Sequence, residues 1–105
     1  MSNKSCCLGI IETKGLSPAL EAADTMLKSG QIELAGLYFV GGGQVAVVIT
    51  GTIGPVQAAV EDGVAASKRK GEVLNRNVIP RCHDNLMKLL EALRPELLSA
   101  NEHPT

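Results

Sequence analysis

The chain alternates between short, almost wholly apolar runs and longer segments in which apolar residues recur every three or four positions. The short runs predict β-strands, and the longer segments predict α-helices. We expect strands at 7–11, 33–40, 44–50 and 72–80, and helices at 17–29, 55–70 and about 84–93. The order βαββαβ followed by a further helix predicts an α/β (α+β) domain of the ferredoxin-like kind. In that topology both long helices cover one face of an antiparallel sheet.

The first helix has the clearest local signals. Ser17 is a suitable N-cap, and Pro18 fits the first helical position. The polar residues at 12–15 predict a turn before the helix, and Gly30 predicts its end. The residues that this spacing directs toward the core are Leu20, Ala23 and Leu27.

The second helix presents a face of small residues, which allows a helix to lie close to a sheet. Pro55 marks its start, and the basic residues at 68–70 suit the negative end of the helix dipole. The members of the small-residue face are Val56, Ala59, Val60, Gly63, Val64 and Ser67. The strand that follows is expected to be interrupted by its polar residues at 75–77.

The third strand is apolar on both of its faces. Val45, Val47 and Ile49 point one way, and Ala46 and Val48 point the other. The helices cover only one face in the predicted topology. The second face therefore needs a cover, either from the C-terminal helix or from another subunit.

Three consecutive glycines, Gly41, Gly42 and Gly43, join the second and third strands. Glycine takes positive φ angles without strain and lets other groups approach its backbone closely. The run is therefore either a simple hairpin turn or the lining of a site, and the residues alone leave both interpretations open.

Composition narrows the class of protein. The chain has 105 residues, 45% of them hydrophobic, which is enough for one domain with one core. Ten Lys and Arg against eleven Asp and Glu give a formal charge of −1, and no basic cluster is interleaved with aromatic residues. Nucleic acid is therefore not expected as a partner. A membrane is not expected either, because no apolar run approaches the roughly 18 residues of a membrane span.

The N-terminus lacks the long apolar core of a signal peptide, and three cysteines do not make a disulfide framework, so we expect a cytoplasmic protein. Cys82 and His83 are adjacent, but no acidic residue is placed to orient them for nucleophilic catalysis. Cys6 and Cys7 would lie near this pair across antiparallel strands, and Cys and His are zinc or iron–sulfur ligands. Neighbouring residues of a strand point to opposite faces, so Cys6 and Cys7 are poorly placed to share a metal ion. We therefore expect no metal and no cofactor. We also expect no enzymatic activity, because no residue is placed to activate Cys82.

Several motifs together resemble the bacterial microcompartment shell domain. They are the segment 8–15 (LGIIETKG), the segment 19–28 (ALEAADTMLK), the glycine hairpin, the small-residue helix and the segment 78–83 (VIPRCH). The resemblance assigns 6–93 to the shell domain, 1–5 to an N-terminal extension and 94–105 to a tail.

This resemblance implies a cyclic homohexamer that tiles edge to edge with other shell proteins in the bacterial cytoplasm and encloses enzymes. It implies a central pore for small polar metabolites, and targeting peptides of the enclosed enzymes as further partners. The pore residues would be Phe39, Val40, Gly41, Gly42, Gly43 and Gln44. The residues at the edge of the hexamer would be Lys28, Gln31, Arg81 and His83.

The chain departs from the family pattern at four positions. Gly42 stands where relatives often have serine, and Phe39 stands where they often have lysine. Cys82 replaces an expected proline, and Gln31 replaces asparagine or arginine. A glycine pore would be wide and lined by backbone groups. Two alternatives stay open: an oligomeric regulator that senses a small molecule, and a metal or redox module that uses Cys6, Cys7 and Cys82.

Overall fold

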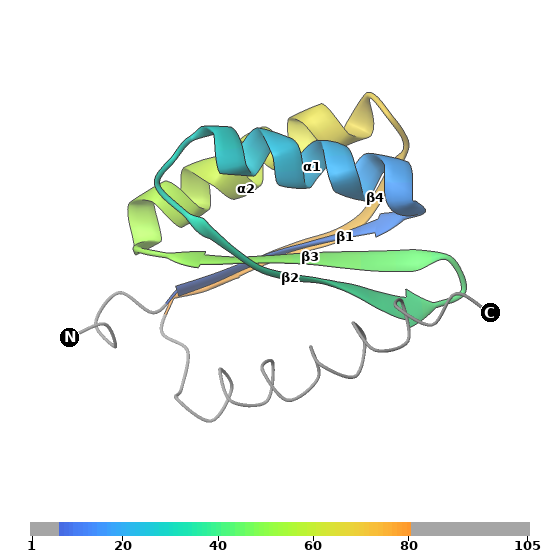
Figure 1. The fold of residues 1–105 in the computed structure, drawn as a ribbon, viewed down its shortest axis with the longest axis horizontal. Coiled ribbons are helices and arrows are strands. Elements are labelled where there is room, and N and C mark those ends of the chain that lie inside the picture. Colours follow the sequence, from blue (N-terminus) through green and yellow to red (C-terminus); the bar gives the residue numbers. More distant parts are fainter. Residues whose placement is uncertain (1–6, 81–105) are drawn as a thin grey trace.

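The computed structural model describes residues 7–80 as an antiparallel four-stranded sheet with two helices on one face (Figure 1). The strand order is β2-β3-β1-β4, so β2 and β4 form the two edges. This arrangement confirms the predicted split βαβ order; the expected helix at 84–93 lies outside the described residues. The elements are β1 (Cys7–Lys14), α1 (Leu16–Lys28), β2 (Glu33–Gly41), β3 (Gln44–Gly51), α2 (Ile53–Lys68) and β4 (Glu72–Ile79).

Both faces of the sheet are apolar and buried at its centre, as the sequence predicts. Every residue of β3 from Val45 to Ile49 is buried. Val45, Val47 and Ile49 belong to the core beneath the helices. On the opposite face, Ala46 and Val48 form a second cluster together with Leu8 and Tyr38. The sheet therefore separates two apolar layers.

The helices lie very close to the sheet at two glycines. A Cβ atom on Gly9 of β1 would come within 2.6 Å of Val60 Cγ2 in α2. A Cβ atom on Gly63 of α2 would come within 2.9 Å of both Ile11 Cδ1 and Met26 Cγ. Real Cβ atoms essentially never approach other atoms this closely, so the spacing of α1, α2 and β1 requires glycine at these positions.

The predicted small-residue face of α2 is confirmed, because all six of its members are buried. The helix starts at Ile53, two residues before the expected start at Pro55. Proline is tolerated there because the first four N–H groups of a helix have no partner within the helix.

The prediction for α1 was right about Ala23, which is buried, but wrong about Leu20, Leu27 and the cap. The helix begins at Leu16 with Gly15 at the N-cap position, so Ser17 is not the cap. Leu20 and Leu27 are 49% and 43% exposed. The narrow space beside α2 admits small side chains and one flexible methionine, and the buried residues are Pro18, Ala19, Ala22, Ala23 and Met26.

β1 is longer than predicted, and β4 is continuous where an interruption was predicted. β1 continues to Lys14 in place of a turn at 12–15, and inside it the buried Thr13 hydroxyl donates to the Gly15 carbonyl at 2.9 Å. β4 continues through 75–77, with a register shift where it passes Glu12 and Thr13 of β1. β4 is an edge strand, so its polar side chains reach solvent without breaking the strand.

We expect Gly9→Ala to lower the free energy of unfolding by about 1–3 kcal/mol, because the added methyl group overpacks the contact with Val60. Gly54→Ala is the matched control: it lies in α2 with no atom within 4 Å of its Cβ position. This control should be neutral or stabilising by up to about 1 kcal/mol. Urea unfolding of both variants tests the pair, and equal stabilities would contradict the close-contact argument.

Candidate functional site

The glycine run forms a tight hairpin loop with a defined backbone. Gly41 and Gln44 are paired across the strands, so Gly42 and Gly43 are the central residues of the turn. The φ angles of Gly41, Gly42 and Gly43 are 97°, 63° and 81°. A two-residue turn with positive φ at both central positions matches the right-handed twist of the flanking strands. All three glycines are exposed, and no atom lies within 4 Å of their Cβ positions.

The loop is held in place by the turn between β1 and α1. The Gly15 N–H donates to the Gly43 carbonyl oxygen at 2.6 Å. Lys14, the residue before this turn, is paired with Gln44 in the ladder between β1 and β3. A distant part of the chain thus fixes the hairpin, which is an ordered projection at one end of the sheet.

Apolar and uncharged residues flank the loop. Phe39 and Val40 are 42% and 57% exposed, and Gln44 is also exposed. The structure thus brings the sequence-predicted pore residues 39–44 together at the tip of one hairpin.

Two of the candidate edge residues, Lys28 and Gln31, lie at the other end of the sheet. Lys28 is in the last turn of α1, and Gln31 follows just before β2 begins. β2 runs from this end to the glycine loop, which at about 3.3 Å per residue separates the two regions by roughly 30 Å. β4 ends in the same row as the start of β2, and Arg81 and His83 follow it in the chain, outside the described residues.

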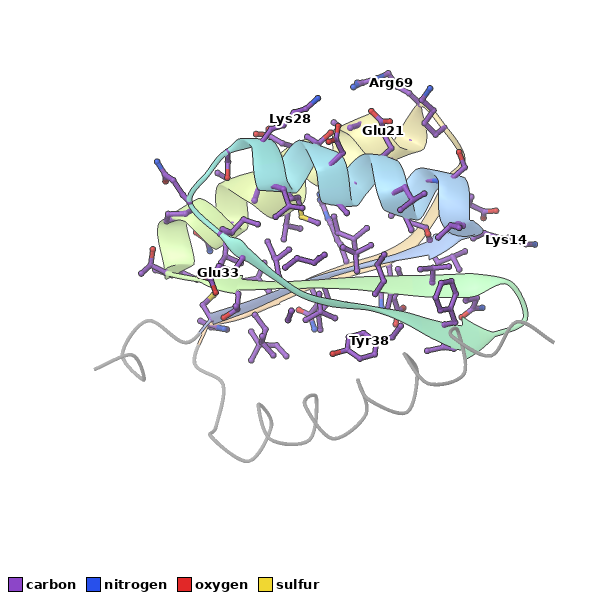
Figure 2. The ribbon with its side chains drawn as sticks, viewed as in Figure 1. Lys14, Glu21, Lys28, Glu33, Tyr38 and Arg69 are labelled. Carbon is purple, nitrogen blue, oxygen red and sulfur yellow. The ribbon has the colours of Figure 1, made fainter. Side chains whose placement is uncertain are left out.

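Lys28 makes an ion pair along its own helix. Its Nζ lies 3.0 Å from Asp24 Oδ2, and the two side chains are 74% and 59% exposed. The hydrogen bond with Asp24 and the charge of Asp24 together hold the pKa of Lys28 above its ordinary value, with a smaller contribution from Glu21. The lysine is therefore fully charged at neutral pH and projects from the helix end (Figure 2). The spacing of four residues was available in the sequence as a signal for this pair.

Two surface features were missed from the sequence. Leu16, Leu20 and Leu27 are all more than two-fifths exposed and form an apolar stripe on α1. A groove of about 650 Å³ lies between α2 and β4. The stripe could have been found by noting that α1 is apolar on two faces, whereas the groove depends on tertiary structure. The groove is lined mainly by Gln57, Ala58, Glu61, Arg76, Asn77 and Val78.

Cys7 is a buried free thiol in the core beneath the helices. Burial raises the pKa of the Cys7 thiol, which disfavours the thiolate that would bind metal or act as a nucleophile. Within residues 7–80, no cluster of His, Cys, Asp or Glu is arranged to hold a metal ion. Cys6, Cys82 and His83 lie outside the described residues. Over the same part of the chain, neither helix is long and apolar enough to cross a membrane.

A sheet that is apolar on both faces, an ordered glycine loop at one end and a charged helix end at the other define a domain suited to assembly. The chain belongs to the bacterial microcompartment shell family, because the BMC domain model matches residues 7–82. Hexamers with a central pore are typical of this family.

Named relatives agree with this assignment. The bacterial microcompartment shell protein PduA of Citrobacter freundii is 47% identical over 83 residues, which cover 79% of this chain and 89% of that protein. The major carboxysome shell protein CsoS1A of Halothiobacillus neapolitanus is 45% identical, covering 79% and 86%. A crystal structure of a microcompartment protein from Desulfitobacterium hafniense DCB has a TM-score of 0.72 and 36% identity. The match covers 78% of this chain and 47% of that longer chain.

We expect Asp24→Asn to lower the pKa of Lys28 toward the ordinary lysine value of 10.5, because the substitution removes both the charge and the strongest acceptor. Since folding raises this pKa, the pair contributes stability at neutral pH and loses it as the pH rises above 10.5. An NMR titration of the Lys28 Cε signal measures the change. Asp62→Asn on α2 is the control, and an equal shift in both variants would contradict the pairing.

Proposed function

We propose that this chain is a structural, non-catalytic shell protein of a bacterial microcompartment in the bacterial cytoplasm. Copies of the chain form a cyclic homohexamer, with the hairpins around the central axis and Lys28 at the outer edge. The observation that carries the proposal, together with family membership, is the placement of the ordered glycine loop and of Lys28 at opposite ends of the same sheet.

In such a ring the strands would run from the central axis to the outer edge. β2 and β3 connect the two ends directly, and β3 is buried from Val45 to Ile49. If the hairpin ends converge on the axis, the sheet edges β2 and β4 face neighbouring copies. The contact is then heterologous, with two different surfaces meeting, and it closes into a ring when the rotation between copies is suitable.

The two sides of the chain offer two different surfaces for this contact. α1 is the helix nearer to the β2 edge, and it carries the exposed leucine stripe. α2 and β4 form the opposite side, which contains the groove. We therefore place the leucine stripe of one copy against the groove of the next. Burying these side chains would remove apolar area that a single chain leaves in water.

The outer edge makes the contacts between tiles. Lys28, Gln31, Arg81 and His83 are the proposed edge residues, and their partners are this same chain or other shell proteins. A weak contact at one edge is repeated around every tile, so the sheet gains strength from multivalency. Targeting peptides of enclosed enzymes and small metabolites crossing the pore are the further proposed partners.

The metal or redox alternative loses support from the burial and raised pKa of Cys7. The regulator alternative predicts a saturable effector site. Because that regulator would also be an oligomer, sheet assembly and its response to edge substitutions test the shell proposal most directly.

We expect native mass spectrometry of the full chain to show a homohexamer. Leu20→Lys should shift the population toward monomers, because it places a charge in the proposed apolar contact. Ala58→Trp should do the same by filling the groove. Ala65→Lys, on an exposed face of α2 outside the groove, is the control that should remain hexameric.

A wild-type chain that stays monomeric at high concentration would contradict the ring itself. Hexamers in all three variants would leave the ring standing and show that the leucine stripe and the groove are not its contacts.

We expect Lys28→Ala to leave rings intact while raising about tenfold the protein concentration needed for two-dimensional sheets, because the lost contact recurs on every edge. Lys70→Ala, beyond the end of α2, is the matched control and should assemble normally. Negative-stain microscopy over a concentration series measures both. Unchanged sheets in Lys28→Ala would contradict the edge role of this lysine.

A further inference from the structure

Two large apolar side chains stand exposed directly beside the glycine loop. Phe39 is 42% exposed, and Val40 is 57% exposed. Together they place apolar surface in water beside a loop that has no side chains of its own. The pair sits at the tip of the sheet, where the proposed ring has its axis.

The strand register fixes where Phe39 lies. Phe39 is paired with Val45, and cross-strand partners share a face of the sheet. Val45 belongs to the core beneath the helices, so Phe39 stands on the helix-covered face, at the hairpin end. The register shifts between Phe39 and Gly41, which leaves Val40 between paired positions at the start of the loop.

Charged side chains are set back from this tip. Residues 39–44 contain no ionisable side chain. Gln44, at the end of the loop, is paired with Lys14 of β1, and Lys14 is paired in turn with Glu72 of β4. Lys14 and Glu72 have opposite signs, and the basic residues at 68–70 precede Glu72 in the chain, so the charged groups at this end lie behind the loop and not on it.

Some backbone groups of the loop already make hydrogen bonds within the chain. The Gly43 carbonyl already accepts a hydrogen bond from the Gly15 N–H. Gly41 is in turn held in the strand ladder opposite Gln44. Fewer backbone groups are then left to replace the water that an ion would shed.

We propose that Phe39 and Val40 form an apolar collar at the mouth of the pore, which makes the passage selective for small uncharged solutes over anions. This inference rests on the proposed ring. An ion that passes an apolar constriction must keep its hydration shell or lose it without compensation, whereas a neutral solute loses little. The collar thus selects by charge, and the glycine loop selects by size.

The test uses sheets of the full-length chain laid over a perforated support, with glycolaldehyde and glycolate as matched neutral and anionic probes. Wild-type sheets should pass glycolaldehyde at least about tenfold faster than glycolate. Phe39→Lys should reduce this ratio by about tenfold, because a ring of positive charges concentrates anions. Phe39→Met, which keeps an apolar side chain without a charge, should retain most of the wild-type ratio.

Val40→Lys is a second variant that should act like Phe39→Lys, and it keeps the test decisive where one variant assembles poorly. A wild-type flux ratio near one, or equal ratios in Phe39→Lys and Phe39→Met, would overturn the collar.

Crystals of the wild-type chain soaked in bromide separate this inference from the proposed function. We expect the loop around a symmetry axis and no anomalous bromide peak beside Phe39 on that axis, with a peak appearing in Phe39→Lys. A loop away from any symmetry axis would overturn the ring. A ring in which Phe39 is buried between subunits, or in which wild type binds bromide on the axis, would overturn the collar alone.

Discussion

The close approach of the two helices to the sheet is the constraint on which the rest of the structure depends. Gly9 and Gly63 leave no room for a Cβ atom, and the inward face of α1 consists largely of alanine. A buried hydrogen bond from the Ser67 hydroxyl to the Pro18 carbonyl, at 2.8 Å, also ties α2 to the start of α1. With so little space inside, the leucines of α1 face outward. The apolar surface available for assembly is thus a consequence of how tightly the core is packed.

This constraint explains which parts of the fold were predictable. The order of the six elements within residues 7–80, the two apolar faces of β3 and the small-residue face of α2 follow from local patterns, and all were confirmed. The inward face of α1 was predicted wrongly because a hydrophobic pattern ranks leucine above alanine. Inside this core, volume decides instead. Ser17 failed as a cap for a related reason, because β1 extends to Lys14 and Gly15 makes the turn into the helix.

Only part of the candidate site could be predicted from the sequence. The run of three glycines in the sequence indicated a tight loop, and the structure shows that all three have positive φ angles. The pair of Asp24 and Lys28 follows from their spacing of four residues on a helix. The bond from Gly15 to Gly43 and the groove beside β4 join segments far apart in the chain. No local pattern encodes such contacts, so only the folded chain reveals that the loop is held in place.

The backbone of the hairpin also determines where the chemistry of the loop can vary. Within residues 7–80, positive φ angles occur only at glycines, and Gly41, Gly42 and Gly43 all have them. A side chain at these positions would meet no atom within 4 Å, yet it would strain the turn. The flanking residues Phe39 and Val40 carry no such strain. In this chain, Phe39 and Val40 are therefore the positions at the tip of the hairpin where polarity can change without straining the backbone.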